Sequence, residues 1–340
     1  MRTTYMKAGE DKLVQRIAKA LAFKSGPWPA LGIGDDAALL APHPGYETVL
    51  TCDWFLQGSH FLPGKHPADS IGWKCLARAV SDIAAMGGQP TCFLLSLALP
   101  DDASLKGASR GNRWLGEFLG GLRRAARRFG CVLAGGDTTQ RREILINVTV
   151  VGEVRAGRAV KRSGAKVGDR IFVSGTLGEA ELGLQKLRRG TRISLRRNDR
   201  ALRKHLYPEP RLALGQWLAD RRLATSMMDV SDGLSSDLPR LCAASQVGAR
   251  ISTAEIPSPK VPLTGTKQRF DALALALNGG DDYELLFTVS QNNVGRMPRS
   301  FQGIALTEIG EITRERRIVT VQQDGTPKPL LPRGWDPFRK

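Results

Sequence analysis

Aspartates beside glycines, or directly after apolar runs, are the residues of this chain best able to do chemistry. A carboxylate just past an apolar strand lies where α/β folds keep their ligand crevices. Neighbouring glycines let backbone amides approach a phosphate without a Cβ in the way. The segments of this kind are GIGDDAALL with Asp35 and Asp36, TVLTCD with Asp53, LARAVSDIAAMGG with Asp82, VLAGGDTT with Asp137, SMMDVSDGL with Asp229 and Asp232, and LNGGDDYELLF with Asp281, Asp282 and Glu284.

Any one of these segments has an ordinary structural explanation. Aspartate in a glycine-rich turn usually serves the turn, and aspartate before a helix usually caps it. If all the segments converge, however, their carboxylates repel one another and require cations. Oxygen ligands without a His/Cys cluster favour Mg²⁺, which keeps waters and bridges phosphates. The pattern therefore indicates magnesium-dependent phosphate chemistry.

Several familiar phosphate and acyl-transfer enzymes are excluded by their missing motifs. The chain has no GxxxxGK[ST], so it is not a P-loop enzyme. It has no HRD or DFG set and no GxSxG elbow, which excludes protein kinases and this type of hydrolase. The stretch Ser174–Leu184 (SGTLGEAELGL) resembles an anion site at a helix start, but it lacks the spacing of a dinucleotide fingerprint.

Alternating apolar and amphipathic stretches predict mixed α/β architecture for the elements that position these residues. The predicted strands are Thr48–Cys52, Cys92–Leu99, Val132–Ala134, Ile144–Val151, Arg170–Val173, Ser226–Met228 and Leu285–Val289. The predicted helices are Ala68–Met86, Leu115–Phe129, Gly178–Leu187, Pro210–Arg221 and Leu234–Ser245. In this scheme Asp53 and Asp137 end strands, while Asp232 and Gly233 open a helix. Pro239 should kink that helix or mark its first turn.

Two domains are expected for a chain of 340 residues with a near-average hydrophobic share of 41%. The basic, glycine-rich stretch Val154–Gly168 marks the break. We therefore place an N-terminal domain at 1–154 and a C-terminal α/β domain at 155–340.

The net charge of +17 is concentrated in Arg123–Arg128 and in Lys186–His205. A basic RNA-binding module is one interpretation, and it predicts salt-sensitive RNA affinity without ATP turnover. We favour solvated basic surface, because no aromatic residue interrupts the second cluster to stack on a base. Nucleic acid is therefore not an expected partner.

The remaining composition points to the cytosol. The five cysteines are dispersed without a CxxC, which argues against a disulfide framework and against structural zinc. The first residues predict a short amphipathic helix and lack the features of a signal peptide, and no apolar run is long enough for a membrane span.

Taken together and in order, the segments resemble thiamine-monophosphate kinase. The resemblance covers about Leu31 to Val289, with a weaker match at PRGWDPF near the end. The matching segments are GIGDDAALL, TCDWFLQGSHF, ARAVSDIAAMGGQP, LAGGDTT, KRSGAKVGDRIFVSGTLGEA, MDVSDGLSSDL and LNGGDDYELLFTV. This family shares a superfamily with aminoimidazole ribonucleotide synthetase, selenophosphate synthetase and a hydrogenase-maturation protein.

The resemblance implies two mixed α/β domains. The N-terminal domain would bind ATP and magnesium and pair across a homodimer to close a β-barrel, and the C-terminal domain would complete the cleft. The implied ligands of several Mg²⁺ ions are Asp36, Thr51, Asp53, Asp82, Asp137, Asp229 and Asp232. The implied ATP contacts are Gly136, Asp137, Arg162 and Ser231. The implied thiamine monophosphate contacts are His60, Asp281 and Trp335.

The resemblance also implies direct in-line transfer between two phosphates. The acceptor is itself a phosphate monoester with an anionic oxygen, so no general base is assigned and no catalytic side chain is expected. Two positions depart from the family: Asp281 stands where Glu is frequent, and Cys52 stands where Thr is common.

Three alternatives stay open at this point. A sister activity such as aminoimidazole ribonucleotide synthetase is the nearest, although GSHF and GGDDYELLF favour the thiamine enzyme. The RNA-binding module is the second. The third is a catalytically inactive relative that only binds nucleotide, which the intact acidic set disfavours.

Overall fold

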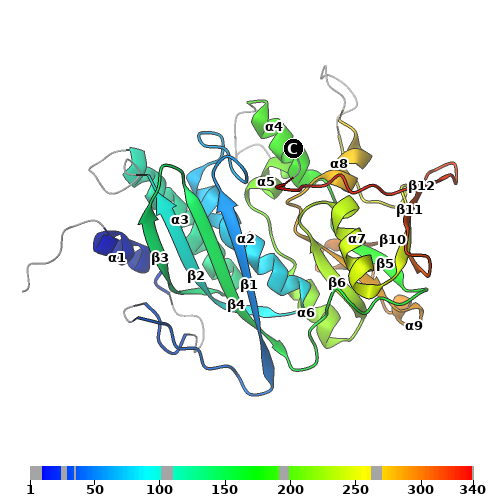
Figure 1. Ribbon diagram of the computed structural model, residues 1–340, viewed down its shortest axis with the longest axis horizontal. Coiled ribbons are helices and arrows are strands. Elements are labelled where there is room, and N and C mark those ends of the chain that lie inside the picture. Colours follow the sequence, from blue (N-terminus) through cyan, green and yellow to red (C-terminus); the bar gives the residue numbers. More distant parts are fainter. Residues whose placement is uncertain are drawn as a thin grey trace, which may run out of the picture. The chain divides into compact units, whose positions relative to one another are not determined.

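The computed structural model describes residues 10–23, 29–33, 36–100, 110–190, 199–261 and 270–338. The chain divides into two compact units, shown in Figure 1. The first comprises Met1–Ile83 and Gln89–Glu153, and the second comprises Ala84–Gly88 and Val154–Lys340. The change of unit after Glu153 adjoins the stretch that sequence analysis marks as a break. No sequence pattern predicts that the short segment Ala84–Gly88 belongs to the second unit.

The first unit contains a four-stranded sheet with strand order β1-β4-β2-β3. Helices α2 and α3 lie together on one face of this sheet (Figure 1). Strand β2 runs parallel to β3 and antiparallel to β4. The elements are α1 (Glu10–Leu21), β1 (Tyr46–Leu56), α2 (Ala68–Ala85), β2 (Gln89–Leu99), α3 (Arg110–Phe129), β3 (Val132–Gln140) and β4 (Leu145–Arg155).

One face of this sheet is buried more completely than the other. In β2, Phe93, Leu95 and Leu97 are buried, whereas Leu94 between them is 38% exposed. Successive side chains of a strand point to opposite faces, so Leu94 lies on the face away from the helices. No closed barrel is present among the described residues of this unit, because its sheet is open.

The second unit contains an eight-stranded sheet with order β12-β11-β7-β10-β5-β8-β6, and β9 pairs with β10. Its strands are β5 (Arg170–Ser174), β6 (Ala224–Val230), β7 (Gly248–Ser252), β8 (Glu284–Val289), β9 (Ser300–Phe301), β10 (Ile304–Thr313), β11 (Ile318–Val321) and β12 (Pro327–Pro329). Its helices are α4 (Glu179–Arg188), α5 (Arg200–Leu206), α6 (Leu212–Asp220), α7 (Leu234–Ser245), α8 (Ala272–Asn278) and α9 (Gln291–Val294).

Both faces of the central strands of this sheet are buried. Leu286 of β8 packs into a core with α7 and α8, while Leu285 and Phe287 pack into a second core with α6. Because helices cover both faces, the strand reads as a continuous apolar run rather than an alternating one. The carboxylates just before β8 are therefore held by a fully buried strand.

Every predicted strand and helix is present, most with longer bounds. Sequence analysis missed the helices α5, α8 and α9, strand β7 and the strands from β9 onward. Helix α7 runs through Pro239 instead of starting there. All five cysteines are free. None of the described helices combines the length and apolar composition that crossing a membrane requires.

Helices α2 and α3 touch through glycine. A Cβ at Gly72 would overlap the backbone of Phe118, and a Cβ at Gly121 would overlap the backbone of Asp69. The two helix backbones can approach this closely only because neither position carries a side chain. Gly120, the neighbour of Gly121, faces elsewhere and would meet only the tip of Arg124.

This pair of adjacent glycines gives a matched test of the packing. Gly121→Ala should lower the free energy of unfolding by about 1–3 kcal/mol, because the new methyl group forces the helices apart. Gly120→Ala should raise it by up to about 1 kcal/mol, because alanine favours the helix and nothing is in its way. Urea unfolding of both variants measures the difference. The same sign of change in both would contradict this account of the contact.

Candidate functional site

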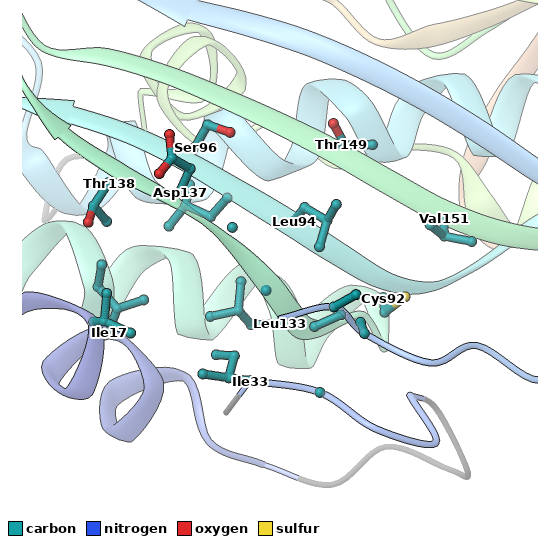
Figure 2. Close-up of a pocket in the computed structure, with 18 of the residues that line it drawn as sticks. Ile17, Ile33, Cys92, Leu94, Ser96, Leu133, Asp137, Thr138, Thr149 and Val151 are labelled. Atoms are coloured by element: carbon teal, nitrogen blue, oxygen red, sulfur yellow. The ribbon is translucent and has the colours of Figure 1, made fainter. Parts of the chain in front are cut away.

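A cavity of about 800 Å³ lies on the side of the first unit's sheet that carries Leu94. Strands β2, β3 and β4, helix α1 and the segment around Asp36 line it. Figure 2 shows Ser96, Asp137 and Thr138 gathered toward one end of the cavity, with Cys92 and Val151 toward the other. The lining of the cavity is mainly apolar, and Asp36 and Asp137 contribute its carboxylates.

The backbone geometry next to Asp137 depends on Gly136. A Cβ at position 136 would overlap the backbone of Leu95 in the neighbouring strand. Asp137 pairs in register with Ser96 of the same strand. Sequence analysis ends the strand at Asp137, but β3 continues to Gln140, so the carboxylate projects from within the sheet.

A second group of oxygen donors joins β1 to α2. Thr51 Oγ1 donates a hydrogen bond of 2.5 Å to Asp82 Oδ2. Asp53 lies two residues further along β1, on the same side as Thr51, and Nη2 of Arg78 is 3.7 Å from its carboxylate. Arg78 precedes Asp82 by about one helical turn, so both side chains lie on one face of α2. Strand β1 also extends past Asp53, contrary to its expected end there.

His60 lies in the turn that follows β1. Its backbone N–H donates to the carbonyl of Leu56, and the backbone N–H of Leu56 donates to His60 Nδ1 at 3.0 Å. Because Nδ1 accepts a hydrogen bond, a neutral His60 ring carries its proton on Nε2. The ring centroid is 5.8 Å from that of Phe55. This tautomer makes Nε2 a hydrogen-bond donor.

In the second unit, three loops that are far apart in sequence are joined through their backbones. The N–H of Asp281 donates to the carbonyl of Ser231 at 2.7 Å, and the N–H of Trp335 donates to the carbonyl of Asp232 at 2.9 Å. A Cβ at Gly334 would overlap the carbonyl of Asp232. The structure therefore brings Ser231, Asp232, Asp281 and Trp335 together.

Asp281 and Tyr283 have left-handed backbones, with φ of 67° and 50°. Residues other than glycine rarely adopt this conformation, and it clusters at functional sites. Tyr283 Oη donates to Asp281 Oδ1 at 2.8 Å, and the N–H of Tyr283 donates to the carbonyl of Val230. The loop before β8 is thus held in a strained shape by the loop after β6.

The two acidic residues after Asp281 serve the protein itself. Glu284 is buried and accepts hydrogen bonds from Lys204, from Arg211 Nε at 2.7 Å and from Ser174 Oγ at 2.5 Å. Burial acts to raise the pKa of Glu284, but the charge of Lys204 and the bonds of Arg211 outweigh it and lower the pKa to about 2. Glu284 is therefore a permanently charged structural anion.

Asp282 is also buried, and its carboxylate accepts the N–H groups of Gly178 and Ala180 at the start of α4. Burial raises the pKa of Asp282 to about 7, against the opposing charge of Lys204 and these two N–H groups. The sequence Ser174–Leu184 resembles an anion site at a helix start. The anion it binds is this internal carboxylate.

The remaining expected residues of the second unit are placed individually. Asp229 is buried in β6, next to the Ser231–Gly233 turn. Arg162 is exposed, and its carbonyl accepts a hydrogen bond from Ser245 Oγ at 2.9 Å. Asp35 lies outside the described residues.

No three or more His, Cys, Asp or Glu side chains form a ready metal site within the described parts of the chain. The first unit holds Asp36 with Asp137, and Thr51 and Asp53 with Asp82. The second holds the Asp229–Asp232 turn. The proposed metal ligands therefore stay a prediction. Sequence analysis did not single out Lys204, Arg211 or Asp237, because their partners are distant in sequence or are backbone groups.

Comparison with known proteins finds relatives over most of the chain. Residues 34–154 match the N-terminal domain of AIR synthase related protein, and residues 166–322 match the C-terminal domain. The thiamine-monophosphate kinase of Escherichia coli (strain K12) is 39% identical over 311 residues, which cover 91% of this chain and 92% of that protein.

Solved structures share the fold. The thiamine-monophosphate kinase of Stenotrophomonas maltophilia K279a has a TM-score of 0.76 and 36% identity, and the match covers 93% of this chain and 96% of that one. AaThiL, solved in complex with AMPPCP and TMP, has a TM-score of 0.74 and 31% identity over 99% of this chain and 100% of that one.

The buried anion Glu284 gives a stability prediction. Glu284→Gln should lower the free energy of unfolding by about 3–5 kcal/mol, because it leaves Lys204 and Arg211 largely buried without their counter-charge. The matched control is Glu308→Gln, since Glu308 pairs with Arg170 where both side chains are 33% exposed. That change should cost less than about 1 kcal/mol.

Urea unfolding at several pH values measures both variants. Because the pKa of Glu284 is lowered from 4.5 to about 2, the difference between wild type and Glu284→Gln should be complete above about pH 4.5. It should shrink as the pH falls toward 2. Equal losses for the two variants at neutral pH would contradict the buried-anion account.

Proposed function

The chain belongs to the thiamine-monophosphate kinase family of AIR synthase related proteins, and we propose that it transfers the γ-phosphate of ATP to thiamine monophosphate, giving thiamine diphosphate. The observation that carries the proposal is the 39% identity to the Escherichia coli kinase over 91% of this chain. AaThiL, which aligns over 99% of the chain, was solved with an ATP analogue and TMP together.

The cavity of the first unit is the proposed nucleotide site. Its apolar lining from β2 and β3 suits a purine base, since binding pockets for small molecules are mostly apolar with a few placed polar groups. Asp36 and Asp137 add negative charge to the cavity lining, where a metal-bound phosphate chain would be favoured. Gly136 leaves room beside Asp137. Arg162 and Ser231 are the proposed nucleotide contacts from the second unit.

The donor set fits Mg²⁺, because every proposed ligand offers oxygen and none offers sulfur or imidazole. The proposed ligands of several ions are Asp36, Thr51, Asp53, Asp82, Asp137, Asp229 and Asp232. When bound, Mg²⁺ supplies charge neutralisation between two polyanions and alignment of the transferred phosphoryl group. The Thr51–Asp82 hydrogen bond fixes the orientation of one ligand before any ion arrives.

The acceptor contacts come from His60, Asp281 and Trp335. His60 offers an Nε2–H donor to a phosphate oxygen, because its Nδ1 is used by the backbone. Trp335 is 44% exposed, and its backbone N–H donates to the carbonyl of Asp232. Its indole can therefore stack on a ring. The acceptor oxygen is already anionic, so these residues position it rather than remove a proton.

The direct test incubates purified protein with ATP, Mg²⁺ and thiamine monophosphate and detects thiamine diphosphate by mass. We expect product only when all three are present. A parallel reaction with the precursor of aminoimidazole ribonucleotide tests the sister activity, and a filter-binding assay with RNA tests the basic-module interpretation. Turnover of the imidazole precursor alone, or no ATP turnover at all, would overturn the proposal.

Removing one proposed magnesium ligand should abolish most of the turnover. Asp82→Asn keeps the shape of the side chain but removes its charge, and we expect kcat to fall on the order of 100-fold or more. Asp69→Asn is the control, because Asp69 lies on the same helix but pairs with Arg124 on an exposed face. Its kcat should stay within about two-fold of wild type. Near-normal kcat in Asp82→Asn would count against the magnesium scheme.

We also propose that the exposed β1 part of the first unit's sheet face, which carries Leu50 and Trp54, pairs with a second copy, closing the β-barrel that the family implies. Leu50 and Trp54 of β1 are 67% and 54% exposed. They share the face of Cys52, whose Sγ contacts Asn147. Asn147 pairs in register with Ser96, two residues from Leu94. Exposed apolar side chains contiguous over neighbouring strands are typical of a protein interface.

A charge placed on this face should separate the copies. Trp54→Glu should convert a dimer into a monomer, because burying one unpaired carboxylate per copy outweighs the apolar contact. Light scattering after size-exclusion chromatography measures the mass. Val167→Glu, at a 53% exposed position of the second unit, is the control and should leave the mass unchanged. A monomeric wild type would refute the pairing.

Both the ATP supply and the free cysteines suit a cytosolic location.

A further inference from the structure

Asp237 on α7 is fully buried, yet it belongs to none of the groups discussed so far. Its Oδ2 accepts the backbone N–H of Ser231 at 3.1 Å and that of Asp232 at 3.0 Å. Its Oδ1 accepts Arg240 Nη1 at 2.7 Å. A buried carboxylate with three charge-assisted or backbone bonds is well compensated, so the arrangement is stable in the folded protein.

The bonds of Asp237 differ from ordinary helix capping. In a capping box, the third residue of the helix reaches back to the N-cap. The N-cap of α7 is Gly233, and Asp237 is the fourth helical residue. Its carboxylate reaches past the cap to the two residues before it. Asp237 therefore fixes the loop that enters the helix rather than the helix end.

This loop joins the proposed ligand-binding residues of the second unit. The carbonyl of Ser231 accepts the N–H of Asp281, and the carbonyl of Asp232 accepts the N–H of Trp335. The same two residues thus bind Asp237 through their N–H groups and bind Asp281 and Trp335 through their carbonyls. A shift of this turn would move Asp232, Asp281 and Trp335 together.

Arg240 completes the arrangement from the exposed side. Its Nη1 is 2.7 Å from Asp237 Oδ1 and 2.5 Å from Asp232 Oδ2. The side chain of Arg240 is 44% exposed, whereas Asp237 is fully buried. The guanidinium can therefore leave Asp232 when another cation takes that carboxylate, while the two N–H bonds of Asp237 remain in place.

We propose that Asp237 is the positioning residue for the proposed ligand-binding residues of the second unit. Its carboxylate accepts the N–H groups of Ser231 and Asp232. These bonds position the Asp232 carboxylate, Asp281 and Trp335 together for ligand binding. Arg240 is a replaceable counter-ion in this arrangement. The inference rests on the proposed function for its catalytic consequence, but the positioning itself is a property of the protein without ligand.

Amide hydrogen exchange on wild-type protein, without nucleotide, metal or thiamine monophosphate, tests the positioning directly. The amides of Ser231 and Asp232 should exchange as slowly as those of β6, because they end on a buried carboxylate. Exchange at the rate of an open loop would overturn the proposal. This measurement does not depend on any activity, so failure of the proposed function leaves it intact.

Three variants separate the amide bonds from the ion pair. Asp237→Ala removes both and should speed exchange at Ser231 and Asp232 at least 10-fold. Arg240→Gln removes only the ion pair, and exchange there should stay within about three-fold of wild type. Asp237→Asn keeps one oxygen for the amides and loses the pair, so it should match Arg240→Gln. If Asp237→Ala does not fold, the wild-type and Arg240→Gln measurements still decide.

Kinetics then show whether positioning matters for turnover. At a temperature where all variants are folded, Asp237→Ala should raise the Mg²⁺ concentration for half-maximal rate and the KM for thiamine monophosphate by about 10- to 100-fold. Arg240→Gln should leave both within about three-fold. Equal effects of the two variants would assign the role to the ion pair and overturn the proposal. Unchanged Mg²⁺ dependence and KM in Asp237→Ala would make Asp237 structural only.

Discussion

A carboxylate taken out of water is costly unless charge or hydrogen bonds replace its hydration, and this chain buries several beside its proposed site. Glu284 is compensated by Lys204 and Arg211, and Asp282 by the first amides of α4. Asp237 is compensated by two loop amides and Arg240. Glu284 and Asp282 thereby bind segments distant in sequence to one another, whereas Asp237 binds the turn just before its own helix. The need to compensate buried negative charge therefore decides which segments of the second unit are held together.

The same constraint sorts the aspartates by role. Acids that the protein itself neutralises are internal ties, as Asp237, Asp282 and Glu284 show. Asp36 and Asp137 are exposed and line the cavity of the first unit, where a cation from solvent can reach them. Mutual repulsion among acids of this second kind is what would draw divalent ions to them. Asp281 and Asp282, which are adjacent in GGDDYE, therefore have different roles: Asp281 is a proposed acceptor contact, and Asp282 binds the start of α4.

Local patterns predicted the elements better than the contacts between them. Strands such as β2 and β8 follow from their apolar runs, and α7 from its periodicity. Short elements of the second unit, including α5 and β7, have weaker patterns and take their form from the sheet around them. The interpretation of Lys186–His205 as solvated surface is wrong for Lys204, which is buried against Glu284, 80 residues further along. Residues 191–198 of that segment lie outside the described parts. No local pattern reveals such a partner.

The shape of the loop before β8 suits Asp281, at a position where the resemblance implies that Glu is frequent. Asp281 adopts a left-handed backbone, which Asp and Asn tolerate better than other side chains because they hydrogen-bond locally. Its short carboxylate also accepts the hydroxyl of Tyr283, whose backbone is left-handed as well. A longer side chain at 281 would reach further toward an acceptor but would form this local bond less readily. Asp281 thus reaches less far than a longer side chain, but its loop is already held in shape by this local bond. The hydrogen bond from the Asp281 N–H to the Ser231 carbonyl links this loop to the turn whose amides bind Asp237.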